Sequence, residues 1–334
     1  MIVRVGSGKT PDLTLTIMVS GDAAGMRIHL DTDLGGDPDD ACALALLLGW
    51  PDVEITGITT TIDPGGWRAA YVTHLLDLVG RNDIPVVAGA AMSSTRREVA
   101  LPVIGDERYW PADITPRPSP PGAALDLLQA SIDGGARLVG IGPYTNLAAL
   151  ELLRPNSLTG VEVVVMGGWV TPPRVGLPAW GPQRDWNVQW DTRAAETVAA
   201  AATLTLATLP ATLQAPLRAA DLPRLRDSGP LGGLLARQSQ IHSVDSGKAA
   251  LGPVHDGLPD DLLNFHYDPV ACAVAVGWPG AVIEAMTLQT AIEDSVLRWH
   301  QSVDGRSTRV LIEVDGPEFT EVWLTAVERA QAAT

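Results

Sequence analysis

Cysteine is scarce in this sequence of 334 residues, which contains only Cys42 and Cys272, each inside an apolar, helix-like run. A disulfide framework or a thiolate metal site needs more cysteines at characteristic spacings. We therefore expect both residues to be small, buried apolar side chains.

Long hydrophobic segments are also missing, because no apolar run reaches the roughly 18 residues that cross a membrane. Residues 13–19 are apolar, but they are few, include alternating threonines and follow Asp12, so they do not match a secretory signal. We expect a cytoplasmic protein with no membrane partner. The first convincing strand opens at Met26, so residues 1–25 are expected to be an N-terminal extension outside the fold.

Positive charge is in short supply, since 23 Lys and Arg stand against 39 Asp and Glu, for a formal net charge of −16. Sequence-independent binding to nucleic acid or to anionic membranes requires basic patches. Both kinds of partner are therefore excluded from our expectations. The hydrophobic content of 46% is ordinary for a globular protein with a sizeable core.

Runs rich in Val and Ile alternate with helix-like patterns after residue 26. The expected strands are residues 27–30, 53–61, 84–87, 137–141, 161–166 and 204–208. The expected helices are residues 41–48, 67–79, 123–131, 147–153 and 194–202. Continuous apolar strands separated by helices predict an α/β fold, with a mostly parallel sheet covered by helices on both faces. Length alone allows one domain or two.

The densest feature is D-T-D-L-G-G-D-P-D-D at residues 31–40, with five aspartates in ten residues. Carboxylates this close repel one another if dry, and a hard cation such as Ca²⁺ or Mg²⁺ relieves the repulsion. The two central glycines allow the backbone to fold the acids toward one point. The alternative is an acidic loop with a helix N-cap at Asp39 or Asp40, but a cap needs no companions. The pattern favours a metal site at the carboxyl end of the first strand, where parallel sheets bind ligands.

Two further segments carry polar groups of the same kind. Asp268 stands at an expected helix start, where it could cap the helix or add another oxygen ligand. Asp185 and Asn187 alternate with tryptophans; on an extended segment they would share one side and could grip adjacent hydroxyls, although a polar turn could look similar. Residues 90–122 and 171–182 read as long loops, and the second is expected to form a wall or lid of a pocket.

Five motifs now stand in a fixed order. They are DTDLGGDPDDA at 31–41, VGRNDIPVVAGA at 79–90, GPYTN at 142–146, VMGG at 165–168 with DWN at 185–187, and YDPVA at 267–271. Together they make the chain resemble the inosine-uridine preferring nucleoside hydrolase family, whose patterns include D-x-D-x-G-x-D-D-A, G-P-x-T-N and H-D-P-L-A. The resemblance runs from about residue 26 to the C-terminal helix.

The resemblance implies a nucleoside hydrolase-like catalytic domain over residues 26–334 with a Rossmann-like core, assembled as a homodimer or homotetramer. It implies a calcium-dependent N-ribohydrolase of nucleoside catabolism, which cleaves a ribonucleoside into ribose and free base with a calcium-bound water activated by Asp33. The implied calcium ligands are Asp33, Asp40, the carbonyl of Ile141, and Asp268. The implied substrate contacts are Asp39, Asp63, Met166, Asp185 and Asn187, and Asp31 would orient the loop.

The acid that assists the departing base is left open by the sequence. Tyr267 stands where some family members carry a histidine that protonates the base, and the adjacent His266 would point the other way on an extended segment. The proton could come instead from Tyr267, His242 or His300. Alternatively, aromatic rings such as that of Trp186 could stack on the base.

Three further questions stay open. Asp37 and Pro38 lengthen the family's opening pattern, and no role for Asp37 follows from the sequence. Asp63 replaces the family's asparagine, which changes one sugar contact. The nucleobase that leaves is undetermined, so a hydrolase of the same fold that acts on a modified nucleoside is an alternative. A non-catalytic protein that binds a nucleoside or a sugar is another, but the presence of a catalytic base at Asp33 argues against it.

Overall fold

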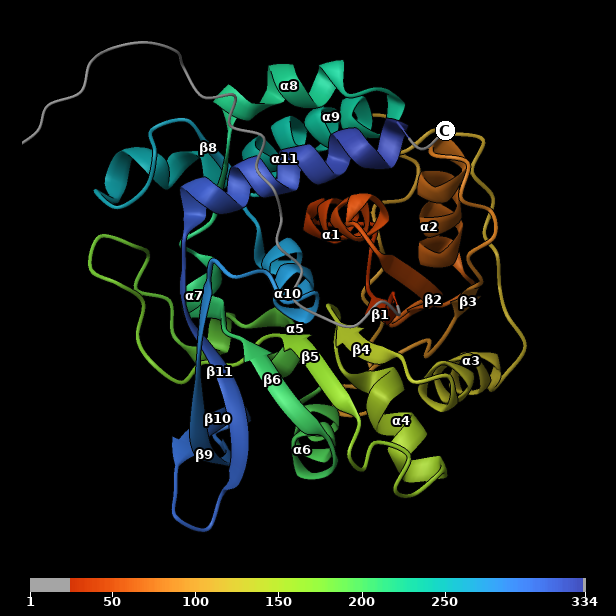
Figure 1. Cartoon of the computed structure of the whole chain (residues 1–334), viewed down its shortest axis with the longest axis vertical. Helices are drawn as coiled ribbons and strands as arrows, with labels where there is room; N and C mark the ends of the chain where they lie inside the picture. The colour runs from red at the N-terminus through yellow and green to blue at the C-terminus, as the bar shows by residue number, and fades with distance from the viewer. Residues whose placement is uncertain (1–24, 333–334) are drawn as a thin grey trace, which may run out of the picture.

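Nine strands form one sheet in the computed structural model, which describes residues 25–332 (Figure 1). The expected N-terminal extension therefore lies outside the described residues, except for Gly25. The spatial order is β10-β9-β11-β6-β5-β4-β1-β2-β3. The bounds are β1 (Met26–Thr32), β2 (Val53–Thr60), β3 (Val86–Ala88), β4 (Arg137–Gly140), β5 (Glu162–Met166), β6 (Thr203–Ala207), β9 (Ala281–Glu293), β10 (Val296–Gln301) and β11 (Arg306–Val314).

Seven neighbouring strands, from β11 to β3, run parallel, and only β9 and β10 pair antiparallel at one edge. Along β5 the side chains of Val163 and Val165 face one hydrophobic core, while that of Val164 faces another. This period-two alternation, apolar on both faces, is why the strand reads as a continuous apolar run. The mostly parallel α/β sheet is thus confirmed, with an antiparallel edge that the sequence did not reveal.

Helices cover both faces of the sheet (Figure 1). One face carries α1 (Asp39–Gly49), α2 (Trp67–Leu78) and α10 (Tyr267–Ala275), with α8 (Leu222–Asp227), α9 (Pro230–Asp245) and α11 (Gly316–Ala332) packed outside them. The other face carries α3 (Ala123–Asp133), α4 (Thr145–Leu153) and α6 (Thr192–Ala201). Two short helices, α5 (Trp186–Trp190) and α7 (Leu209–Thr212), and the small ribbon of β7 (Pro216–Arg218) with β8 (Leu262–Phe265) complete the described chain.

The carboxyl ends of the parallel strands meet at one edge of the sheet. β1 pairs with both β2 and β4, so the aspartate-rich loop after β1 lies between the segments that follow those two strands. Gly142 permits this approach, since a Cβ there would lie 2.8 Å from the backbone nitrogen of Asp33. Gly35 has a φ of 125°, which side-chain-bearing residues rarely adopt. The loop can therefore turn its acids back toward the sheet.

Cys42 and Cys272 are both free and buried, as expected. Among the described helices, none is long and apolar enough to cross a membrane.

Candidate active site

A pocket of about 520 Å³ opens beside the carboxyl ends of β1, β4 and β5. Its walls come from the loop after β1, from Ile141 and Met166, from α5 and from the first turn of α10. Trp180 of the 171–182 loop also lines it, which confirms the expected wall. The volume falls within the range of small-molecule sites, of the order of 300–1,000 Å³.

Three buried carboxylates converge on one point of this pocket. Ligand oxygens of Asp39, Asp40 and Asp268 all lie within 4.8 Å of one another. Burial raises the pKa of each well above its usual range, and the charges of neighbouring aspartates raise it further. No basic side chain forms an ion pair with any of the three within residues 25–332. Oxygen ligands, burial and uncompensated charge together suit a hard divalent cation.

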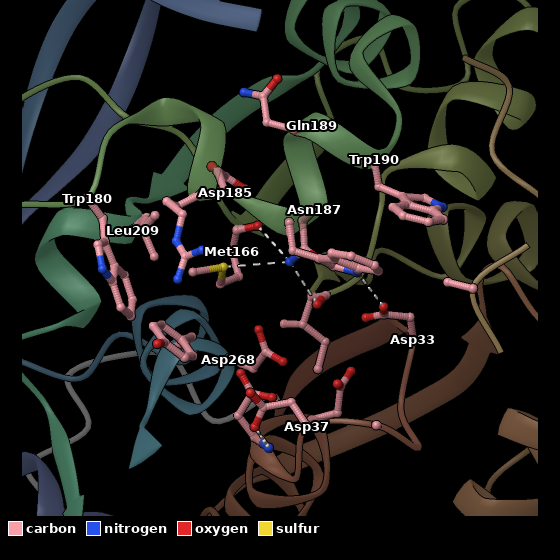
Figure 2. A pocket seen from close by; sticks show the side chains of 18 of the residues that line it. Asp33, Asp37, Met166, Trp180, Asp185, Asn187, Gln189, Trp190, Leu209 and Asp268 are labelled. Atoms are coloured by element: carbon pink, nitrogen blue, oxygen red, sulfur yellow. Dashed lines mark hydrogen bonds between the residues drawn. The ribbon is translucent and has the colours of Figure 1, made fainter. Parts of the chain in front are cut away.

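Asp33 lines the same pocket but is not one of these three residues. Its Oδ2 accepts a hydrogen bond of 3.1 Å from the indole Nε1 of Trp186 (Figure 2). Burial raises the pKa of Asp33, while the positive charge of Arg68 and the bond from Trp186 oppose that rise. The guanidinium of Arg68 holds the loop itself, donating to the carbonyls of Asp33, Leu34, Ile62 and Ala100.

Asp37, which had no role in the sequence, forms an ion pair with Lys248. Asn264 joins them by donating its Nδ2 to Asp37 Oδ1 at 2.6 Å and by accepting from Lys248 Nζ at 2.6 Å. His242 Nε2 also lies 3.1 Å from Asp37 Oδ2. Asp37 and Pro38, which lengthen the loop, thus add a carboxylate whose charge is balanced by Lys248.

Asp31 anchors the loop from below through neutral hydrogen bonds. Its Oδ1 accepts from Thr59 Oγ1 at 2.5 Å and from Asn146 Nδ2 at 2.7 Å. Burial raises its pKa to about 7, although both hydrogen bonds act against the rise. Asn146 also donates to the carbonyl of Thr60, so the residue connects the ends of β1 and β2 with α4.

Asn187 lies where β4 and β5 end. Its Nδ2 donates to the carbonyls of Ile141, at 3.0 Å, and Met166, at 3.2 Å, and all three residues line the pocket. A carbonyl has two lone pairs, so the Ile141 oxygen keeps one for another partner. Residues 186–190 form helix α5, so the expectation of an extended segment was wrong.

Asp185 is the N-cap of α5, and its carboxylate accepts from the backbone nitrogens of Val188, at 3.1 Å, and Gly168, at 2.5 Å. Burial raises its pKa to about 6, despite these two bonds. Because Asn187 lies within the helix, the two side chains do not share one side of a strand. Asp185 still lines the pocket, but both oxygens already have backbone donors.

Four other residues that the sequence offered as sugar contacts or proton donors do not line this pocket. Asp63 accepts from Thr60 Oγ1 and from the first backbone nitrogens of α2, which is a local capping arrangement. His266 is buried, with its ring 4.4 Å from that of Trp323, so it cannot touch a leaving group in the pocket. His242 does not line the pocket, and His300 is 48% exposed on β10, beside Glu293.

Aromatic side chains form two walls on opposite sides of the carboxylates (Figure 2). On the Asp33 side, Trp186 and Trp190 stack with ring centroids 4.3 Å apart. On the other side are Trp180 and Tyr267, and the ring of Phe265 contacts both. A flat base could stack on either wall.

The sequence model of the inosine-uridine preferring nucleoside hydrolase family matches residues 28–321. The chain belongs to this family. It is 30% identical over 246 residues to the pyrimidine-specific ribonucleoside hydrolase RihA of Salmonella paratyphi C (strain RKS4594), a match covering 69% of this chain and 77% of that protein. This nucleoside hydrolase therefore acts on N-glycosyl compounds.

Solved structures agree on the fold. A purine-preferring ribonucleoside hydrolase from Gardnerella vaginalis superposes with a TM-score of 0.75 at 25% identity, covering 92% of this chain and 99% of that one. A plant nucleoside hydrolase gives a TM-score of 0.74 at 21% identity, covering 90% of this chain and 98% of that one. The single α/β domain is thus shared with these enzymes.

Sequence reasoning missed several residues that shape the site of this nucleoside hydrolase. Arg68 was overlooked, and Asn146 was given no role of its own within the GPYTN motif, because their roles depend on backbone carbonyls and on strand ends distant in the sequence. Lys248 and Asn264 were overlooked for a similar reason, since each lies more than two hundred residues from Asp37. Only the rarity of lysine could have drawn attention to Lys248.

Proposed function

We propose that the protein is a calcium-dependent ribonucleoside hydrolase in which Asp33 is the base. The observation that carries this proposal is the convergence of the buried carboxylates of Asp39, Asp40 and Asp268 beside Asp33 in one pocket. A second hydrolase reading, a modified nucleoside as substrate, is compatible with the same site.

Asp40 and Asp268 would hold the cation, together with the carbonyl of Ile141, and Asp33 would complete the set from the edge of the cluster. Asp39 belongs to the same group of three, so it would lie close enough to bind a ribose hydroxyl or the cation itself. Bound calcium would supply a Lewis acid that lowers the pKa of water and orients hydroxyl groups.

The chain's own residues account for the remaining requirements. Asp33 accepts the proton of the attacking water, and it needs only modest basicity because the bound cation would lower the pKa of that water. Met166 and Asn187 line the sugar side of the pocket. The carboxylates stabilise the positive charge that develops on the sugar as the glycosidic bond breaks.

The decisive experiment measures ribose release from a panel of purine and pyrimidine ribonucleosides, in calcium and in EDTA. We expect activity in calcium, its loss in EDTA, and its return when calcium is restored. Asp33→Ala should lower kcat by about 10²-fold or more, as expected when a general base is lost. The exposed Asp83→Ala serves as the matched control, because Asp83 pairs with Arg81 at the surface.

Undiminished turnover in EDTA would contradict the calcium mechanism, and wild-type turnover in Asp33→Ala would remove Asp33 as the base. The panel also addresses specificity, since one relative is named pyrimidine-specific and another purine-preferring. Cytoplasmic location and assembly as a homodimer or homotetramer stay predictions.

A further inference from the structure

Lysine is almost absent from this protein: only Lys9 and Lys248 occur among its 23 basic residues. Within residues 25–332 Lys248 stands alone, and it lines the pocket with a side chain that is only 14% exposed. Every other cationic side chain in that range is an arginine or a histidine. A buried ammonium at the pocket is therefore unlike the rest of the protein's basic residues, most of which lie nearer the surface.

The ammonium of Lys248 is held in a fixed position. Of its three N–H groups, one donates to Asp37 Oδ2 and one to Asn264 Oδ1. No further oxygen of the described residues accepts from it, and Nζ lies 4.9 Å from the centroid of the Tyr267 ring. Burial alone would lower the pKa of Lys248, but the charge of Asp37 and then of other neighbours raises it above its usual value. The residue therefore stays a charged donor with one N–H left over.

The direction of the reaction places the leaving base on the side of the pocket where Lys248 lies. Attack on the anomeric carbon and departure of the base occur on opposite faces of the sugar in an in-line displacement. Asp33 lies on one side of Asp268, and Trp180 lies on the other (Figure 2). With water attacking from the Asp33 side, the base departs toward the wall of Trp180 and Tyr267, beside Lys248.

Other cations of the pocket are less suitable. The guanidinium of Arg68 already donates to four backbone carbonyls. Arg96 lies over the ring of Trp190, on the Asp33 side. Arg184 lies over Trp180 on the leaving-base side, but it is an exposed side chain and has no ion pair among the described residues to fix it. Water screens an exposed charge, so Lys248 has the stronger effect on a developing charge.

We propose that Lys248 is a catalytic residue that hydrogen-bonds the departing base, and that Asp37 is the positioning residue that holds it. The inference rests on the proposed hydrolase function and adds the missing leaving-group contact. The bond between the anomeric carbon and the base nitrogen breaks, and its electron pair stays on the base. Water oxygen bonds to the anomeric carbon, and its proton goes to Asp33. The base leaves as an anion stabilised by the Lys248 ammonium through a carbonyl oxygen or ring nitrogen, and then takes a proton from solvent.

The test compares substrates that differ in how much help their leaving group needs. Uridine and inosine carry poor leaving groups, whereas the nitrophenolate of p-nitrophenyl riboside departs unaided. With saturating calcium, Lys248→Met should lower kcat/KM for the nucleosides about 10²-fold, the usual effect of losing one charged donor. The loss on the nitrophenyl riboside should be less than about tenfold. Calcium binding measured by calorimetry should be unchanged, which shows that the variant is folded.

A double variant, Asp37→Asn with Lys248→Met, separates the role of the ammonium from the harm of an unpaired Asp37. We expect the same selective loss in the double variant. Recovery of nucleoside hydrolysis there would overturn the proposal, because the single variant would then have failed only through the uncompensated carboxylate. A selective loss in Arg184→Met but not in Lys248→Met would transfer the role to Arg184.

Arg81 is half-buried and does not line the pocket, so Arg81→Met is the control and should match the unaltered enzyme on both substrates. If Lys248→Met lost equal activity on the nucleosides and on the nitrophenyl riboside, the leaving-group role of Lys248 would be contradicted, while the proposed hydrolase function would stand. An unaltered enzyme that releases ribose from neither substrate would contradict the proposed function, and this inference with it.

Discussion

His29 couples the stability of the sheet beneath the site to pH. It is fully buried on β1, and its ring bridges two hydroxyls, with Nδ1 2.8 Å from Ser131 Oγ and Nε2 3.0 Å from Thr59 Oγ1. The single hydroxyl proton of Thr59 goes to Asp31, so Thr59 must accept from His29. The neutral ring with its proton on Nε2 therefore satisfies the whole chain of hydrogen bonds.

A second proton on the His29 ring, at Nδ1, would have no hydrogen-bond acceptor while this chain of bonds is kept. Burial lowers the pKa of His29 from the ordinary 6.5 to about 3. The folded state therefore binds fewer protons than the unfolded state between these values, and stability falls as pH drops from 6.5 toward 3. With about 1.4 kcal/mol per pKa unit, this group alone costs roughly 2 kcal/mol of the free energy of unfolding at about pH 5.

The perturbation that isolates this effect is His29→Gln. Glutamine can accept from Ser131 and donate to Thr59, but it does not titrate. We expect the free energy of unfolding in urea to fall between about pH 7.5 and pH 5 by roughly 2 kcal/mol less in the variant than in the unaltered protein. The measurement is made in EDTA so that cation binding does not contribute.

The comparison of the two pH dependences cancels the titrating groups that are not joined to His29 by hydrogen bonds. His300→Gln removes an exposed histidine of β10 and is the matched control, which should follow the unaltered protein at both pH values. If His29→Gln loses as much stability on acidification as the unaltered protein, the buried neutral imidazole does not control this part of the acid response, and the argument fails.

Two further predictions concern the carboxylates and the loop that carries them. Asp268→Asn should weaken calcium binding at least about tenfold, as measured by calorimetry. In EDTA near pH 8 the same variant should have a free energy of unfolding higher by roughly 1–3 kcal/mol, because burial and neighbouring charges penalise the ionised form of Asp268. A lower stability in EDTA would contradict this view of the cluster. Arg68→Met should lower the free energy of unfolding, measured in urea, by roughly 3 kcal/mol. The reason is that the carbonyls to which Arg68 donates, such as those of Leu34 and Ala100, lose a charged donor. A change below about 0.5 kcal/mol would show that water replaces the guanidinium at no cost.

The buried parallel strands could be predicted because their sequences carry the burial directly. β5 is apolar over nearly its whole length and is covered on both faces, so an unbroken apolar run identifies it. β9 is mostly exposed, and its sequence shows no regular alternation that would distinguish a strand. Helix α5 spans five residues, which is too short for a helical periodicity to be visible.

The site was predictable where function depends on residue type at a strand end, and not where it depends on long-range pairing. Asp40 and Asp268 converge as expected, because α1 and α10 begin at the same edge of the sheet. Asp63 was expected to contact the sugar, but it does not line the pocket: it accepts from Thr60 Oγ1 and from the backbone nitrogens five and six residues later, a local geometry that residue type alone does not distinguish from a ligand.

The five aspartates of residues 31–40 resolve their mutual repulsion in different ways. Asp31 is held by a hydroxyl and an amide, and Asp37 is neutralised by Lys248. Asp33 accepts from an indole, and the oxygens of Asp39 and Asp40 converge with those of Asp268. A crowd of acids therefore does not imply that every one of them binds a cation. The hydrogen bonds and the ion pair of Asp31 and Asp37 fix the loop that carries Asp39 and Asp40, and the proposed cation site is centred on these two residues and Asp268, with Asp33 at its edge.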